Sequence, residues 1–301
     1  ELMAAFTEPI LDSLPAGSIY FGGTDAGRFA VTAVNDLQTP PPAFCLTQNG
    51  LADNTYMAYL REIYGKRIWL PAQEDSNAAF KQYVNDVKAG RIPAGADVKI
   101  EDGKVSVQGV GGVMQINGIL ARMIFDHNKD AHPFFVEESY VLPWMYPYLE
   151  PFGLILKLHA EPVPELAPET IARDRRFWDE TEAKLTAMPE FAGNDAARRL
   201  FSKLRAAGAG VYEYRKLDAE AEAAFRQAIR LCPTSPEANF RLADMLAARQ
   251  RLDEAIAVME NLQAVCPPEQ AERAASYLQQ LKDQRNPKPD EPATDSPATE
   301  P

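Results

Sequence analysis

The chain has 301 residues; 46% of them are hydrophobic and 25% are charged, a composition typical of globular proteins with room for two domains. Its net charge of −12 argues against nucleic acid, and against an anionic membrane surface, as the main partner, because both need clustered lysines and arginines. No apolar run approaches the roughly 18 residues of a membrane span. The chain begins at Glu1 without a signal peptide, so we expect a processed or excised piece of a longer protein.

The first informative segment is residues 17–37, which follows a predicted helix over residues 1–14. It predicts a buried strand over residues 18–21 that turns through Gly22 and Gly23 directly into a helix, with Thr24 or Asp25 as its cap. We name residues 22–25 the elbow. In open α/β sheets ligands bind at the carboxyl ends of strands, where a helix N-terminus favours an anion. The elbow matches neither the dinucleotide fingerprint nor the P-loop, so a plain turn with a helix cap is the alternative.

Two similar units follow, with strands predicted over residues 44–47 and 67–71 and helices after each. Three successive strand–loop–helix units predict a parallel sheet with right-handed crossovers. Each strand ends in a polar loop, and if these loops align, their side chains meet in one crevice. The alternative is that the same polar residues only cap helices. The predicted ligand-binding residues are Gly22, Gly23, Thr24, Asp25, Arg28, Gln48, Asn49 and Asp75.

Residues 98–107 alternate in polarity around an Asp-Gly pair, the strongest short signal for a hairpin, which we expect to extend an edge of the sheet. A buried helix is predicted over residues 113–125, and further sheet strands over residues 134–140 and 154–158.

Glu137 and Glu138 are adjacent in the strand predicted over residues 134–140, so alternation places them on opposite faces, with one of them able to face the crevice. They therefore do not predict a catalytic pair, and no catalytic residue is identified. No cofactor or metal site is predicted from the spacing of His127, His132 and His159. The three cysteines, Cys45, Cys232 and Cys266, match no zinc or redox motif and are interpreted as small apolar residues.

The last third of the chain repeats itself with a period of 34 residues. A small residue, a large apolar residue and a proline recur in order, a pattern that resembles the tetratricopeptide repeat; the matching pairs include Ala221 and Ala255, Phe225 and Met259, and Pro233 and Pro267. Two antiparallel helices approach closely only where one offers a small residue, and the proline ends the second helix. The usual mid-turn glycine is absent, with Lys216 in its place.

The sequence thus predicts a three-layer α/β domain, with a mostly parallel sheet and an added hairpin, followed by an all-α tetratricopeptide-repeat domain. The predicted divisions are an α/β domain over residues 1–165, a connector helix within 166–194, repeats with a capping helix over 195–283, and a disordered tail over 284–301.

Five segments together resemble the soluble C-terminal part of bacterial multi-pass membrane proteins in the O-mannosyltransferase-like glycosyltransferase family. They are YFGGTDAGRF, LTQNGLADNTYM, IWLPAQEDSNAAFKQYV, FFVEESYVLPWMYPYLEPFGLILKL and FSKLRAAGAGVYEYRKL, which begin at residues 20, 46, 68, 134 and 201. The family tends to carry a Gly-Asp-Asn-Asp-like turn at the elbow, where this chain has Thr24 at one of the acidic or amide positions. The resemblance implies catalysis in a membrane half that is not part of this chain.

By that resemblance, the chain is expected to be a non-catalytic, extracytoplasmic module that binds a glycan or protein acceptor, with a membrane-embedded parent segment upstream of Glu1. A second hypothesis is an active site for a nucleotide or phosphorylated sugar at the elbow, with Arg28 clamping an oxyanion and Asp25 acting as base. A third is a structural scaffold whose repeats recruit a protein.

Overall fold

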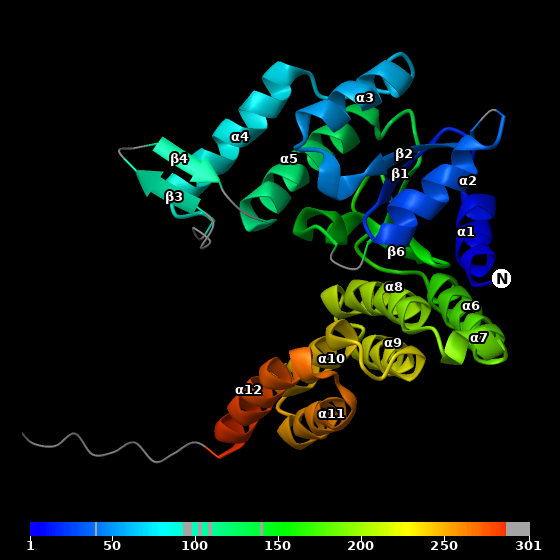
Figure 1. The fold of residues 1–301 in the computed structure, drawn as a ribbon, viewed down its shortest axis with the longest axis vertical. Helices are drawn as coiled ribbons and strands as arrows, with labels where there is room; N and C mark the ends of the chain where they lie inside the picture. The colour runs from blue at the N-terminus through cyan, green and yellow to red at the C-terminus, as the bar shows by residue number, and fades with distance from the viewer. Residues whose placement is uncertain (40, 93–97, 102–103, 108–109, 139–140, 287–301) are drawn as a thin grey trace, which may run out of the picture.

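The computed structural model describes residues 1–39, 41–92, 98–101, 104–107, 110–138 and 141–286. It shows an α/β domain with a five-stranded sheet, followed by a helical part (Figure 1). The predicted disordered tail lies outside the described residues from position 287 onward. Among the described helices, none is long and apolar enough to cross a membrane.

The sheet has the strand order β2-β1-β5-β7-β6. Strand β1 pairs in parallel with both β2 and β5, whereas β7 pairs antiparallel with β5 and β6. The expectation of a mostly parallel sheet is therefore wrong: the sheet is mixed, because the chain returns from β5 without a crossover helix. The strands are β1 (Ser18–Gly22), β2 (Ala43–Thr47), β5 (Phe134–Glu137), β6 (Leu149–Phe152) and β7 (Ile155–Leu158).

Helices cover both faces of this sheet, and the alternation along each strand decides which side chains they meet. Phe21 and Phe134 face a core shared with Phe125 of α5, whose ring lies 5.2 Å from that of Phe134. On the opposite face, Tyr20 and Phe135 pack in a second core with residues of α1 and of α6 (Pro168–Thr186). The helices of this domain are α1 (Leu2–Ser13), η1 (Gly27–Val31), α2 (Thr32–Asp36), η2 (Gln48–Gly50), α3 (Asn54–Tyr64), α4 (Gln73–Lys88), α5 (Val110–Asn128) and η3 (Pro143–Tyr148).

The strand predicted over residues 67–71 does not form, so this prediction is wrong. The chain passes from α3 to α4 in irregular structure, and side chains satisfy its backbone groups. Asn128 of α5 accepts from the Trp69 N–H at 2.8 Å and donates to the Trp69 carbonyl at 2.9 Å. Arg61 donates to the carbonyl of Pro71 at 2.6 Å. These side-chain contacts take the place of hydrogen bonds to a neighbouring strand. The third parallel strand of the sheet is β5, which pairs with β1.

The predicted hairpin forms from β3 (Val98–Glu101) and β4 (Lys104–Val107), which pair antiparallel. Its expected place is wrong, because the two strands make a separate sheet beside α4 and the edges of the five-stranded sheet are β2 and β6 (Figure 1). Strand β6 was not predicted. It is an edge strand, so it tolerates Pro151, which has no backbone N–H to donate.

The helical part begins with α6 and α7 and continues with helix pairs joined by short turns. The pairs α8/α9 and α10/α11 have the predicted 34-residue offset, and the small residues Ala221 and Ala255 are fully buried where the helices meet. Cys45 and Cys232 are buried, whereas Cys266 is partly exposed. The helices are α6 (Pro168–Thr186), α7 (Pro189–Ala192), α8 (Asp195–Tyr214), α9 (Asp218–Leu231), α10 (Pro236–Ala248), α11 (Leu252–Val265) and α12 (Pro268–Arg285).

The turn inside each pair contains a residue in the left-handed region, Lys216 with φ 58° and Gln250 with φ 61°. These two are 34 residues apart, so the period extends to backbone conformation. A left-handed conformation costs a residue with a side chain about 1–2 kcal/mol, a cost that glycine avoids.

We therefore predict that Lys216→Gly and Gln250→Gly each raise the free energy of unfolding by about 0.5–1 kcal/mol, because the relief of strain exceeds the entropy that glycine loses on folding. Urea unfolding followed by circular dichroism measures the change. Lys216→Ala and Gln250→Ala are the controls and should give no gain. Glycine variants no more stable than these controls would contradict the assignment of strain.

Candidate functional site

The carboxyl ends of β2, β1 and β5 lie side by side, as parallel pairing requires. Gly22, at the end of β1, is opposite both Thr47 and Glu137. The loops that follow β1 and β2 therefore meet the carboxyl end of β5, and the three bring together the elbow, residues 48–49 and residues 137–138. We name this group the carboxyl-edge cluster.

The carboxyl group of Glu137 fills the elbow. Its Oε2 accepts hydrogen bonds from the backbone N–H groups of Gly23 at 3.2 Å and Thr24 at 3.1 Å, and its Oε1 accepts from the Thr24 hydroxyl at 2.5 Å. The Thr24 hydroxyl in turn accepts from the N–H of Gly27 at 3.1 Å. The elbow donors that were predicted to hold an anionic ligand thus hold a carboxyl group of the same chain.

Glycines make room for the two adjacent carboxyl groups. A Cβ atom on Gly27 would lie 1.7 Å from Oε2 of Glu137, and one on Gly23 would lie 1.8 Å from Oε2 of Glu138. Both distances are far below any van der Waals contact. The glycines at positions 23 and 27 therefore serve close packing against Glu137 and Glu138, and the double glycine is more than a turn signal.

Glu137 is fully buried, and this burial raises the pKa of its carboxyl group to about 7. The hydrogen bonds from Thr24 and Gly23 oppose that rise, whereas the nearby Glu138 adds to it. Tyr20 of β1 is also buried, and its pKa is raised first by this burial and then by the charge of Glu137. The elbow thus contains a carboxyl group that changes charge near neutral pH.

The other side of the cluster is made by Asn49. Its side-chain Nδ2 donates to the Gly23 carbonyl and to Oε2 of Glu138, both at 3.3 Å, and its backbone carbonyl accepts from the side chain of Asn117 of α5 at 2.9 Å. Several buried atoms here have no partner, namely both amide atoms of Gln48, Oδ1 of Asn49 and Nε of Arg28. These four are half of the eight such atoms within the described residues, which makes this edge the place where polar groups are least satisfied.

Of the eight predicted site residues, six belong to the carboxyl-edge cluster and two, Arg28 and Asp75, do not. The six members are Gly22, Gly23, Thr24, Asp25, Gln48 and Asn49. The side chain of Asp25 is 83% exposed and forms an ion pair with Arg28, which lies in η1 after the elbow. Asp75 accepts from the Ala72 N–H at 2.8 Å and caps α4, since the strand that would have brought it to the cluster is absent.

The part played by Glu137 and Glu138 was not predicted from the sequence. Alternation places them on opposite faces of a strand, but no local pattern shows that this strand is the direct neighbour of β1. Two carboxylates after a buried run, combined with glycines at positions 23 and 27, are the signal that could have suggested the contact.

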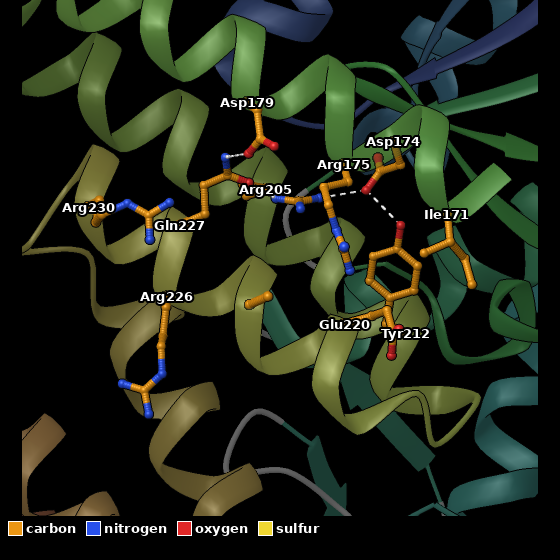
Figure 2. A pocket seen from close by; sticks show the side chains of 11 residues that line it. Ile171, Asp174, Arg175, Asp179, Arg205, Tyr212, Glu220, Arg226, Gln227 and Arg230 are labelled. Carbon is orange, nitrogen blue, oxygen red and sulfur yellow. Dashed lines mark hydrogen bonds and ion pairs between the residues drawn. The ribbon is translucent and has the colours of Figure 1, made fainter. Parts of the chain in front are cut away.

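A second polar site lies between α6, α8 and α9, around a cavity of about 210 Å³ (Figure 2). Asp174 of α6 accepts from Arg205 at 2.8 Å and from the Tyr212 hydroxyl at 2.7 Å, both through Oδ2. Arg205 also donates to Gln227 at 2.7 Å and stacks over the ring of Trp178 at 5.2 Å. Burial, and then the charge of Asp174, raise the pKa of Tyr212. This network ties the connector helix α6 to the first helix pair.

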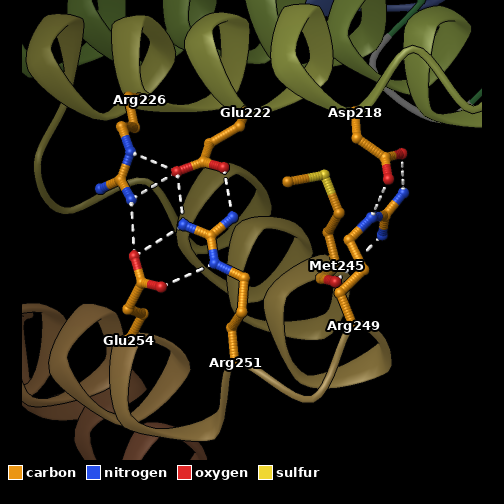
Figure 3. Close-up of polar contacts among 7 residues, drawn as sticks. All are labelled: Asp218, Glu222, Arg226, Met245, Arg249, Arg251 and Glu254. Atoms are coloured by element: carbon orange, nitrogen blue, oxygen red, sulfur yellow. Dashed lines mark hydrogen bonds and ion pairs between the residues drawn. The ribbon is translucent and has the colours of Figure 1, made fainter.

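A third network lies on the surface between the two helix pairs (Figure 3). Arg251 makes paired contacts with Glu222 of α9 and with Glu254 of α11, the shortest at 2.6 Å. Asp218 of α9 pairs with Arg249 beside it. The hydrogen bonds from Arg251, and then from Arg226, lower the pKa of Glu222 to about 2. Because the side chains are partly exposed to water, the network orients α9 and α11 more than it stabilises them.

The histidines have separate structural contacts. His132 bonds the Gly17 carbonyl at 2.8 Å, His127 stacks on Trp69 with centroids 3.8 Å apart, and His159 bonds Glu150 at 3.0 Å. Within the described residues, no three His, Cys, Asp or Glu side chains are grouped as they would be around a metal ion.

Comparison of the chain with protein-family models, with curated proteins and with solved structures gives no match in any of the three.

We predict that Glu137→Gln removes a pH dependence of stability. A carboxyl group whose pKa is raised from 4.5 to about 7 stabilises the fold fully below pH 4.5, and this contribution is lost as pH rises through 7. At pH 8 the glutamine variant should therefore be more stable than the wild type by up to about 3 kcal/mol, with little difference at pH 4.

Urea unfolding at pH 4–8 measures this difference, and Asp25→Asn, which removes an exposed carboxylate two residues from Gly23, is the matched control. The control should show no comparable rise in relative stability between pH 5 and 8. A Glu137→Gln variant that is less stable than the wild type at every pH would show that the elbow requires the ionised group.

We also predict that Asp174→Ala destabilises the chain by about 3–5 kcal/mol, because Arg205 is then buried without a counter-ion. Thermal unfolding measures the loss. The double variant Asp174→Leu/Arg205→Met should recover most of it, and Asp179→Ala, which removes an exposed partner of Gln227, should cost less than about 0.5 kcal/mol. A loss below about 1 kcal/mol in Asp174→Ala would contradict the role given to this ion pair.

Proposed function

We propose that this chain is a non-catalytic binding module of a larger, glycosyltransferase-like membrane protein, and that it lies on the extracytoplasmic side of a bacterial membrane. The main support for a non-catalytic role is that Glu137 occupies the elbow. The N–H groups of Gly23 and Thr24 and the Thr24 hydroxyl, which would hold a phosphate, already donate to its carboxyl group. The link to glycosyltransferases rests on the resemblance of the five sequence segments quoted above.

We propose further that the helical part consists of two tetratricopeptide repeats and a capping helix. Its support is the 34-residue offset of α8/α9 and α10/α11, together with the buried small residues and the matching left-handed turns. In such an array, the first helices of successive pairs form a continuous binding surface. Here these helices are α8, α10 and α12.

The surface formed by α8, α10 and α12 presents aromatic and arginine side chains, the residue types that dominate protein interfaces. Tyr214 is 52% exposed and stacks on Tyr146, with ring centroids 5.5 Å apart. Further along, Phe240 packs against Tyr277 at 5.3 Å, and Arg273 lies over Phe240 at 4.8 Å. These side chains are held in place by neighbours, so a protein or glycan acceptor meets a preorganised surface.

Titration of the chain with short serine- and threonine-containing peptides and with oligosaccharides, followed by NMR, tests this proposal. We expect shifts at Tyr214, Phe240 and Tyr277 with at least one probe, and a loss of affinity of at least tenfold in Tyr277→Ala. Lys282→Ala, which removes an exposed charge on α12 paired with Glu260 of α11, is the control and should bind as the wild type does.

No shift with any probe, or shifts that Tyr277→Ala leaves unchanged, would refute the binding surface. Steady turnover of an activated sugar by the purified chain would refute the non-catalytic role and favour the alternative, an enzyme or binding protein for a nucleotide or phosphorylated sugar at the elbow. That alternative requires the ligand to displace Glu137 from its three hydrogen bonds.

A further inference from the structure

A cavity of about 630 Å³ opens where α1, the elbow and the N-terminal half of α8 meet. Its size is within the range of small-molecule sites. Its lining includes neither Arg273 nor any of the aromatic residues that were assigned to a partner surface above. Its lining residues come from three segments distant in sequence, residues 2–6, 24–26 and 194–203.

The floor of this cavity is apolar and rigid. Phe6 of α1 and Phe201 of α8 are both 1% exposed and meet edge to face, with ring centroids 6.3 Å apart. Leu2, Met3 and Leu200 continue the apolar lining toward the opening, where Met3 is 56% exposed. An apolar chain placed here would remove these side chains from water.

Three charged residues other than Arg199 line the cavity, and each has a partner of opposite charge. Asp25 pairs with Arg28, Asp195 lies 3.6 Å from Arg198, and Lys203 lies 3.2 Å from Glu237. The side chains of Asp25 and Asp195 are 83% and 87% exposed, so they stand at the rim of the cavity.

Arg199 differs from the other charged lining residues. It is half-buried, it lies one turn from Lys203 on the same helix face, and no hydrogen bond or ion pair joins it to any described residue. Its guanidinium lies beside the apolar floor without a counter-ion. A guanidinium is planar and can donate two parallel hydrogen bonds to one carboxylate.

We propose that this cavity binds an apolar molecule that ends in a single carboxylate, with the chain on Phe6, Phe201 and Leu200 and the carboxylate on Arg199. A monoanion fits better than a phosphate, because only one guanidinium is unpaired and the carboxylates of Asp25 and Asp195 stand at the rim, where they repel a second negative charge. The probe that carries these features in their simplest form is decanoate.

The test compares decanoate with decanol, which has the same chain without the charge, in titrations of the whole chain followed by calorimetry and methyl NMR. We expect decanoate to shift the methyl signals of Leu2, Met3 and Leu200, and to bind at least tenfold more tightly than decanol. Arg199→Ala should weaken decanoate binding at least tenfold and leave decanol binding unchanged.

The matched control is Arg176→Ala, which removes an exposed arginine of α6 that lines none of the cavities described and should leave decanoate binding unchanged. Arg199→Lys should bind decanoate with intermediate affinity, because lysine keeps the positive charge but cannot donate two parallel hydrogen bonds to the carboxylate. Equal affinities for decanoate and decanol, an Arg199→Ala variant that binds as the wild type does, or shifts confined to other methyl groups would each overturn the proposal.

Discussion

The buried carboxyl group of Glu137 is the constraint around which the α/β domain is arranged. It joins the end of β5 to the loop after β1 through hydrogen bonds to Gly23 and Thr24, and it requires a glycine at position 27. A buried carboxyl group is tolerated only where donors surround it, so the elbow and the end of β5 have to form together. The same contact uses the donors of a strand–loop–helix elbow that in other proteins bind an anionic ligand.

The helical part depends on a comparable buried contact. Asp174, Arg205 and Tyr212 join α6, which packs on the sheet, to α8 of the first helix pair. The other contacts of the helical part are of another kind. Small residues such as Ala221 and Ala255 are buried where the helices meet, and partly exposed ion pairs such as Arg251 with Glu222 join the two helix pairs. Buried polar groups therefore hold α8 against α6, whereas an apolar core that includes Trp178 of α6 and Phe135 of β5 holds α6 against the sheet. Both the surface of α8, α10 and α12 and the cavity at Arg199 depend on where α8 is held.

Local signals in the sequence predicted local structure well. The strand–glycine–helix pattern of residues 17–37, the Asp-Gly hairpin and the 34-residue period each depend on residues close together in the chain, and each corresponds to elements that form. The failures involve partners that are distant in sequence. Residues 67–71 have the composition of a strand, but Asn128, about 60 positions away, satisfies the backbone of Trp69 instead. Glu137 is 114 positions from Gly23, and no feature of either segment alone shows that they touch.

The most direct test of this account is an NMR titration of the backbone N–H groups of Gly23 and Thr24 with inorganic phosphate and with a nucleoside diphosphate at pH 8. Since Glu137 is ionised at that pH and occupies both groups, the account predicts no saturable shift of either signal with either anion. A saturable shift at both positions would contradict it, because an external anion would then be taking the place of the Glu137 carboxylate.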